Sequence, residues 1–110
     1  MPILNRVDLV FKALADRHRR LILDRLYEED GQTLQALCRG VDMSRQGLSK
    51  HLAILEAAGL VVSIFEGREK RHYLNPIPIQ AVAERWIDKY ATAQLTAVSA
   101  LKKALEEKHG

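Results

Sequence analysis

Apolar residues in the first quarter of the chain recur with the spacing of helix faces. A helix over 6–15 is predicted by four residues in the i, i+3, i+4, i+7 pattern: Val7, Val10, Phe11 and Leu14. Asp16 is of the residue type that caps a helix N-terminus, so a second helix is expected to begin directly after it. The predicted apolar stripe of this second helix consists of Leu21, Ile22, Leu26 and Tyr27.

Two further helices are predicted with only a short turn between them. Thr33 is expected to cap a helix over 34–40, and Ser44 a longer helix that runs through Ala58. In the longer helix, the apolar positions follow i, i+4, i+7: Leu48, Leu52 and Leu55. Gly59 lies just past its end, where glycine often terminates a helix. Two helices joined by a three-residue turn are typical of helix-turn-helix DNA binding, which we assign to 33–58.

The periodicity changes from helical to alternating after Gly59. Apolar residues alternate along 60–65, Glu66-Gly67-Arg68 supplies a turn, and 69–74 returns as a second strand. Two such segments around a short glycine-containing loop predict a β-hairpin. A hairpin that directly follows the second helix of a helix-turn-helix is a wing, here 60–74.

A single long helix is predicted over 79–108, after Pro76 and Pro78 have ended the second strand. Its 30 residues would span roughly 45 Å at 1.5 Å per residue. Its apolar residues keep a three-four spacing and include Trp86, Tyr90, Val98, Leu101 and Leu105. One small core cannot cover a stripe of that length, so part of it is expected to contact a second copy of the chain.

The predicted fold is therefore mainly α with a small β-hairpin, a winged helix-turn-helix with a long C-terminal dimerisation helix, in one domain over 1–110. A length of 110 residues fits a single domain. With 47% apolar and 28% charged residues the composition is that of a globular protein. We find no membrane span and no secretory signal, and one cysteine forms no internal disulfide, so a cytoplasmic location is expected.

The net charge of +3 leans mildly towards polyanionic partners, and its distribution matters more than its size. Since the leucines of the Ser44 helix point inward, its outer face carries Arg45, Gln46, Ser49 and Lys50. Arg and Gln can bind guanine and adenine edges in a bidentate way, and Ser and Lys suit bases or phosphates. The helix N-terminus at Ser44 itself favours a phosphate. The alternative, a merely solvated polar face, is disfavoured by the adjoining turn and wing.

Three stretches of the chain resemble the ArsR/SmtB family of winged-helix repressors: FKALADRHRRLILDRL, MSRQGLSKHLAILEAAGLV and EGREKRHYL. The resemblance implies DNA contact through the Ser44 helix and through a wing whose cations near the tip are Arg68, Lys70 and Arg71. It matches His51 to a family histidine, which either donates to a phosphate or lies at the edge of the core. Arg17, Arg19 and Arg20 could also touch phosphates, although acidic residues share their helix.

The resemblance also implies a homodimer built from the first and last helices, and repression that some signal relieves. The expected interface residues are Val7, Val10, Phe11, Trp86, Tyr90, Val98, Leu101 and Leu105.

Two metal-ligand sets are known for the family, and neither is complete in this chain. The first set places cysteines on the helix before the Ser44 helix. In this chain only Cys38 matches it, because Thr33 and Gln35 occupy the other ligand positions. The second set uses Asp and His residues of the last helix. In this chain there is no histidine over 79–108, and Asp88 is the only aspartate there. We therefore expect no metal site of either type and no cofactor. Cys38 is either a small core residue or a redox-sensing thiol.

No catalytic motif is present, so no enzyme activity is expected. The sequence predicts a regulator that binds double-stranded DNA, in the form of a dimeric repressor with an inverted-repeat operator. The alternative is a protein-interaction module that kept the winged-helix fold and lost DNA binding.

Overall fold

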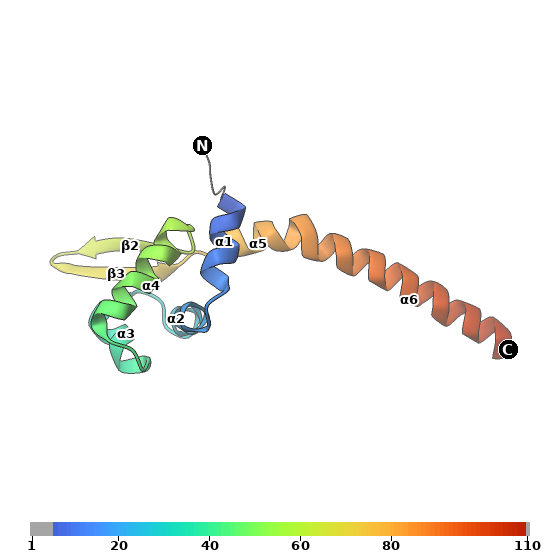
Figure 1. Cartoon of the computed structure of the whole chain (residues 1–110), viewed down its shortest axis with the longest axis horizontal. Helices are drawn as coiled ribbons and strands as arrows, with labels where there is room; N and C mark the ends of the chain where they lie inside the picture. The colour runs from blue at the N-terminus through green and yellow to red at the C-terminus, as the bar shows by residue number, and fades with distance from the viewer. Residues whose placement is uncertain (1–5, 110) are drawn as a thin grey trace. The chain divides into compact units, whose positions relative to one another are not determined.

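The computed structural model describes the backbone of residues 6–109 and the side chains of 6–85 and 96–107. It divides into two compact units, Met1–Ile79 and Gln80–Gly110, which are treated separately below. The first unit contains α1 (Arg6–Leu14), α2 (Arg17–Glu28), β1 (Gln32–Thr33), α3 (Leu34–Gly40), α4 (Arg45–Ala57), β2 (Val61–Glu66) and β3 (Glu69–Leu74). Helix α5 (Ile77–Val82) leads from the first unit into the second, which holds a π-helical turn (Ala83–Ile87) and α6 (Asp88–His109) (Figure 1).

Arginines of α2 fix the connection between α1 and α2. Asp16 caps α2 as predicted, since its carboxylate accepts hydrogen bonds from the backbone N–H groups of His18, at 2.8 Å, and Arg19, at 3.3 Å. The Arg19 guanidinium donates to the carbonyls of Lys12 and Ala13, both at 2.9 Å, and Arg20 donates to Leu14 at 2.7 Å. The last carbonyls of a helix have no intrahelical partner, so the two arginines satisfy the C-terminus of α1.

The helix-turn-helix has the predicted caps. The Thr33 hydroxyl accepts from Ala36 N at 3.2 Å, and the Ser44 hydroxyl accepts from Gly47 N at 3.0 Å. Gly59 follows α4 with a φ of 75°, in the left-handed region that favours glycine. The second helix of this motif, α4, is called the recognition helix below.

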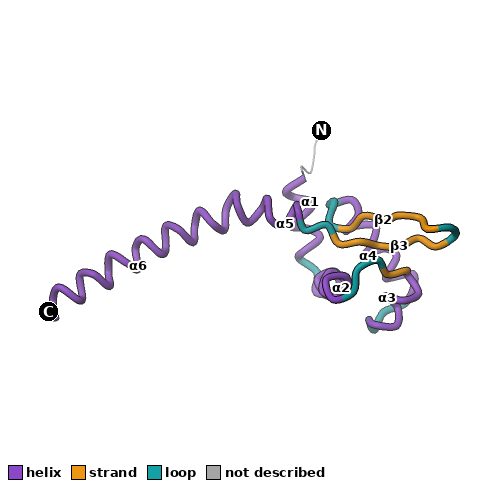
Figure 2. The backbone as a smooth tube through the Cα atoms, turned by 180° about the vertical axis from the view of Figure 1, so that it is seen from behind, coloured by secondary structure: helices purple, strands orange, loops and turns teal. Residues whose placement is uncertain are grey.

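The sheet contains three antiparallel strands in the order β1-β3-β2, where the sequence predicted only a hairpin (Figure 2). The hairpin pairs Val61 with Leu74 and Glu66 with Glu69, which leaves a two-residue loop with a φ of 65° at Gly67. The additional strand β1 pairs with β3 through Gln32 and His72. His72 is only 4% exposed, and its Nδ1 donates to the Gln32 carbonyl at 2.9 Å.

The core of the first unit is formed by apolar side chains of its four helices, α1–α4, and of the start of β2. The predicted stripe of α4 is buried, and so are Val10 of α1 and Leu37 of α3. The predicted stripe of α2 needs correction, because Tyr27 is 82% exposed and Leu21 is also exposed, whereas Leu23 is buried beside Ile22 and Leu26. Tyr27 and Leu21 were placed in the stripe from their spacing alone. Spacing does not show how wide the helix face is that the core covers.

The C-terminal helical region begins two residues earlier than predicted and is not one regular helix. Helix α5 starts at Ile77, whose N–H donates to the Asn75 side chain at 3.3 Å. Pro78 is tolerated because N–H groups in the first turn need no intrahelical partner. The π-helical turn then separates α5 from α6. None of the helices in the described residues has the length and hydropathy that a membrane crossing requires.

Candidate nucleic-acid interface

The recognition helix presents an exposed polar face. With its three leucines buried, the exposed polar residues of the helix and its cap are Ser44, Arg45, Gln46, Ser49 and Lys50. The Ser44 hydroxyl is engaged in the cap, so its capacity to accept is partly used. The side chains of Arg45, Gln46 and Lys50 make no hydrogen bond or ion pair with any residue that the structure describes. Their donors remain available to an external partner.

An open groove of about 460 Å³ separates the recognition helix from the wing. One wall carries Arg45 and Ser49 of α4, and the opposite wall carries Arg68 and Lys70 of the hairpin. Cations on both walls favour a polyanion, while Glu56 and Glu69 in the same lining reduce the local positive potential.

The three wing cations are not equivalent. Arg68 lies in the two-residue loop, is exposed and has no polar partner among the described side chains. Lys70 lies 3.8 Å from Glu56. Arg71 is half-buried: its NH1 donates to the Gly31 carbonyl at 3.0 Å, its NH2 to Glu69 at 2.8 Å, and its Nε lies 3.1 Å from a Glu66 oxygen. Arg71 therefore ties the wing to the β1 side of the sheet, and Arg68 is the cation left at the tip.

Glu56 and Glu66 are residues whose roles the sequence did not reveal. Glu56 accepts a hydrogen bond from Ser63 of β2 and pairs with Lys70 of β3, so it joins the recognition helix to the wing. Glu66 accepts from the Tyr73 hydroxyl at 3.0 Å, and this hydrogen bond raises the pKa of Tyr73 above its ordinary value. Neither role could be recognised from the sequence, because the partners of both glutamates lie seven or more residues away in most cases and meet them only in the fold.

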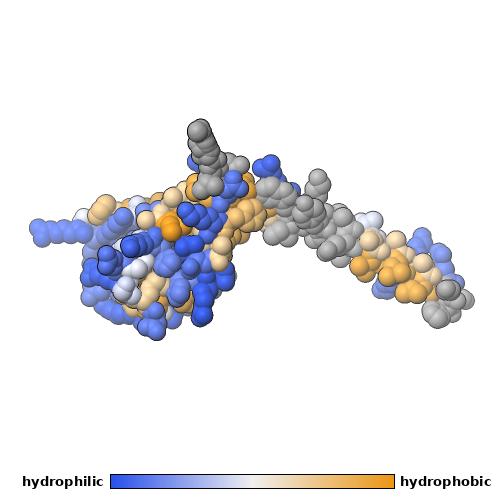
Figure 3. All heavy atoms as spheres, viewed as in Figure 1, coloured by the Kyte–Doolittle hydropathy of each residue, from blue (hydrophilic) through white to orange (hydrophobic). Residues whose placement is uncertain are grey.

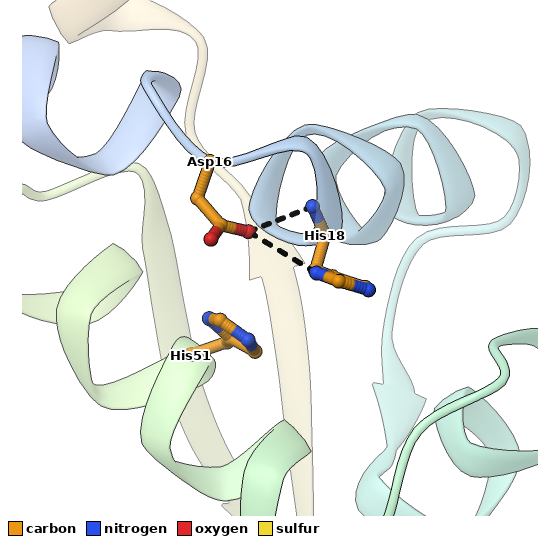
Figure 4. Close-up of side chains that lie close together, drawn as sticks. All are labelled: Asp16, His18 and His51. Atoms are coloured by element: carbon orange, nitrogen blue, oxygen red, sulfur yellow. Dashed lines mark hydrogen bonds and ion pairs between the residues drawn. The ribbon is translucent and has the colours of Figure 1, made fainter.

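His51 is half-buried at the junction of α4 with the beginning of α2. Its Nδ1 lies 3.2 Å from NH1 of Arg19, and its ring stacks on that of His18 with centroids 5.7 Å apart. Figure 4 shows Asp16 above the two rings, with its carboxylate directed towards His18. This position corresponds to the edge of the core, and the half-exposed ring remains accessible from outside.

The Asp16 carboxylate keeps its negative charge more readily than an ordinary aspartate. Desolvation alone would raise its pKa, but hydrogen bonds from the N–H groups of His18 and Arg19 and the positive charge of Arg19 outweigh that effect. The pKa of Asp16 therefore lies below its ordinary value, which keeps the α2 cap charged down to acid pH.

Comparison with known proteins identifies the family. Residues 14–64 match a family model described as a helix-turn-helix domain. The chain is 39% identical over 87 residues to the HTH-type transcriptional regulator YuzN of Bacillus subtilis, covering 74% of this chain and 95% of the relative. An ArsR-like transcriptional regulator from Rhodococcus sp. RHA1 superimposes with a TM-score of 0.75 at 32% identity, over 93% of this chain and 92% of that one. The chain belongs to the ArsR family of winged helix-turn-helix transcriptional regulators.

A second solved structure shows the family fold as a dimer. The winged helix-turn-helix domain of Mb0332 from Mycobacterium bovis is homodimeric and has a TM-score of 0.59 at 26% identity, covering 89% of this chain and 83% of that domain. Family membership identifies the present protein as a DNA-binding transcriptional regulator and not an enzyme. The predictions of fold and of general function are thereby confirmed.

The positions that hold metal ligands in some ArsR-family members carry other chemistry here. Cys38 is a half-buried free thiol, the Thr33 hydroxyl is occupied as the α3 cap, and Gln35 is exposed. These residues do not fit the thiolate set of the family, since two of the three offer no thiolate. Asp88 and its neighbours lie outside the residues whose side chains are described.

The residues predicted for an ArsR-type dimer interface differ in accessibility. Val10 is 2% exposed and lies in the core of the first unit, whereas Phe11 is exposed and Val7 is half-buried. In the second unit the side chains of Val98, Leu101 and Leu105 are all exposed (Figure 3). The side chains of Trp86 and Tyr90 lie outside the described residues.

Proposed function

We propose that this ArsR-family regulator is a homodimeric repressor that binds an inverted-repeat operator. The observation that carries the proposal is the polar face of α4, where Arg45, Gln46 and Lys50 have no partner among the described residues, beside a groove whose other wall is the wing. In the proposed complex α4 enters a major groove and the wing lies along the adjacent backbone.

Base recognition is assigned to the N-terminal half of the recognition helix. Arg45 and Gln46 can each make a bidentate contact, Arg with guanine and Gln with adenine. Ser49 and Lys50, one turn further on, are expected to reach a base edge or a phosphate. The free N–H groups at the start of α4, next to Ser44, favour a phosphate as well.

Phosphate contact by the wing is assigned first to Arg68. Lys70 and Arg71 are already paired with carboxylates, so a phosphate would have to replace those partners. The half-exposed His51 is proposed to contribute a donor to a phosphate at the edge of the interface.

Dimerisation is assigned to the exposed apolar stripe of α6, with Phe11 and Val7 of α1 as additional contacts. The homodimeric structure of the related Mb0332 domain supports dimerisation as such. Val98, Leu101 and Leu105 occur at three-four spacing and are exposed in the single chain, as expected for residues that a second copy covers. The side chain of Val10 is already buried within its own subunit, so Val10 is not assigned to the dimer interface.

We further propose that this protein belongs to the branch of the family without the two known metal-ligand sets, because Thr33 and Gln35 replace two thiolate ligands. Its inducing signal would then act elsewhere on the chain.

The proposal is tested by recovering genomic DNA fragments that bind the untagged protein and sequencing them. The expected result is one enriched sequence with two inverted half-sites about 10–10.5 base pairs apart, or a multiple of that. Affinity for it should fall steeply with salt, and deletion of the gene should raise expression next to the site. Absence of any enriched duplex, together with salt-insensitive retention on DNA, would instead favour a protein-interaction module.

A further inference from the structure

Two histidines and an aspartate meet where the start of α2 lies against the recognition helix. Asp16 and His18 come from one turn of the chain, and His51 comes from the middle of α4 (Figure 4). One candidate ligand atom from each residue lies within 4.8 Å of the other two, and in the described part of the chain this is the group of three that meets that condition. We propose that Asp16, His18 and His51 bind a divalent transition metal such as zinc.

The donor set suits zinc better than the hard cations. Two imidazole nitrogens and one carboxylate oxygen are zinc ligands, whereas calcium and magnesium prefer oxygen alone. Three protein ligands leave a fourth tetrahedral position for water. Neighbouring ligand atoms around a tetrahedral zinc are about 3.3 Å apart for bonds of about 2.0 Å, so no pair of ligand atoms has to approach by more than about 1.5 Å.

Rotation of side chains can supply the approach for His18 and Asp16. His18 is nearly half exposed, so its ring can rotate towards Asp16, to which its Nδ1 is already close at 3.5 Å. The Asp16 oxygen that accepts from the backbone belongs to the α2 cap, and its second carboxylate oxygen remains for the metal. The two rings are stacked with an angle of 22° between their planes, and Figure 4 shows the Asp16 carboxylate close to both of them.

Arg19 must give up one contact for the proposed site to form. A guanidinium only donates hydrogen bonds, so its contact occupies the Nδ1 lone pair of His51, and a metal bound to His51 would replace this contact. Its positive charge also repels a dication. Two of its nitrogens donate to carbonyls of α1, so the guanidinium stays anchored when its NH1 leaves His51.

This site differs from the two ligand sets known for the family, because it uses α2 and α4 rather than α3 or the last helix. It also includes His51, which the proposed function places at the edge of the DNA interface. Metal binding would therefore fasten the recognition helix to α2 through a residue that DNA also approaches.

The test is a zinc titration of the intact, untagged protein in competition with a chromophoric chelator. We expect one zinc ion per chain, with affinity reduced roughly tenfold or more in His18→Gln and in His51→Gln, since even outer-shell changes alter metal affinity by about 10–100-fold. His109→Gln and Cys38→Ser serve as controls and should bind zinc as the parent does. Equal binding by the parent and the His18→Gln variant would overturn the proposal.

Two further measurements separate loss of the site from loss of the fold. Zinc should raise the thermal unfolding midpoint of the parent but not that of His18→Gln, whose own midpoint without metal should match the parent. Cobalt(II) should give the visible absorption of a tetrahedral nitrogen and oxygen site without a thiolate charge-transfer band. A thiolate band that disappears in Cys38→Ser would assign the metal to Cys38 and refute the site.

Discussion

Arg19 NH1 lies 3.2 Å from Nδ1 of His51, so one arginine of α2 connects the end of α1 with the recognition helix. The same guanidinium donates to the carbonyls of Lys12 and Ala13. Arg20 also caps α1, through the carbonyl of Leu14. Two of the three arginines considered as phosphate ligands in the sequence thus have an architectural role, and Arg19 also contacts α4.

Replacement of Arg19 by methionine is expected to destabilise the fold by about 1–3 kcal/mol, because the variant cannot form the charge-assisted hydrogen bonds to two carbonyls. Urea unfolding followed by circular dichroism measures this free energy. Arg17→Met is the matched control, since Arg17 is exposed and makes no polar contact with the described residues. Equal stability of the two variants would show that the Arg19 hydrogen bonds do not hold the helices together.

Arg68 and Arg71 should give different phenotypes although both are cations of the wing. Arg68→Ala should leave stability unchanged and weaken binding to all duplexes alike. The slope of log affinity against log salt should become shallower by about one for each phosphate that the variant no longer neutralises. A dimer carries Arg68 twice, so the change in this slope on a full operator should be about twice as large. Titrations at several salt concentrations measure the slope.

Arg71→Ala is expected to lower the unfolding midpoint, because it removes the hydrogen bond to the Gly31 carbonyl and the ion pairs with Glu66 and Glu69. Arg71→Lys should restore only part of that stability, since lysine lacks the planar fork. If Arg71→Ala melted like the parent and bound DNA as weakly as Arg68→Ala, the structural role assigned to Arg71 would be wrong.

Sequence specificity is expected to depend on Arg45 and Gln46. Each alanine substitution should cost on the order of 1–3 kcal/mol on the preferred operator and relax the preference at one base pair. Arg45→Lys is the sharper control, because it keeps the charge but cannot recognise guanine in a bidentate way. It should retain affinity for random duplex while its preference for the operator falls. Unchanged discrimination in all three variants would remove α4 from base recognition.

Local signals made the helix-turn-helix and its hairpin predictable. Thr33 and Ser44 are hydroxyl residues just before apolar helical periodicity, and each caps the helix that follows. Gly59 and Gly67 lie at breaks in the pattern, where the chain adopts a positive φ. These features depend on a few neighbouring residues and so can be recognised without knowledge of the fold.

Features that depend on distant partners were not predictable. Strand β1 has only two residues, too few to show periodicity, and it forms by pairing with His72, 40 residues away. Whether a wing arginine is paired or free depends on where the Gly31 carbonyl lies. The Asp16–His51 proximity arises only when α2 packs against α4, so no spacing in the sequence indicates it.

The exposed stripe of α6 is expected to determine both association and operator affinity. Leu101 is 61% exposed in the single chain, and burying a large apolar side chain contributes roughly 1.5–3 kcal/mol. Leu101→Asp would bury an unpaired charge in the proposed interface, which is costly. The variant should become monomeric or weakly dimeric while retaining most of its helical circular dichroism.

The operator affinity of Leu101→Asp should also fall much further than that of Arg68→Ala, because two separate monomers must each meet the full entropic cost of binding. Ser99→Asp is the matched control: it adds the same charge to α6 at an exposed polar position outside the stripe and should remain dimeric. Light scattering and DNA titration on the same samples measure both properties. A Leu101→Asp protein that is monomeric and yet binds the full operator as tightly as the parent would show that DNA recognition does not depend on the dimer.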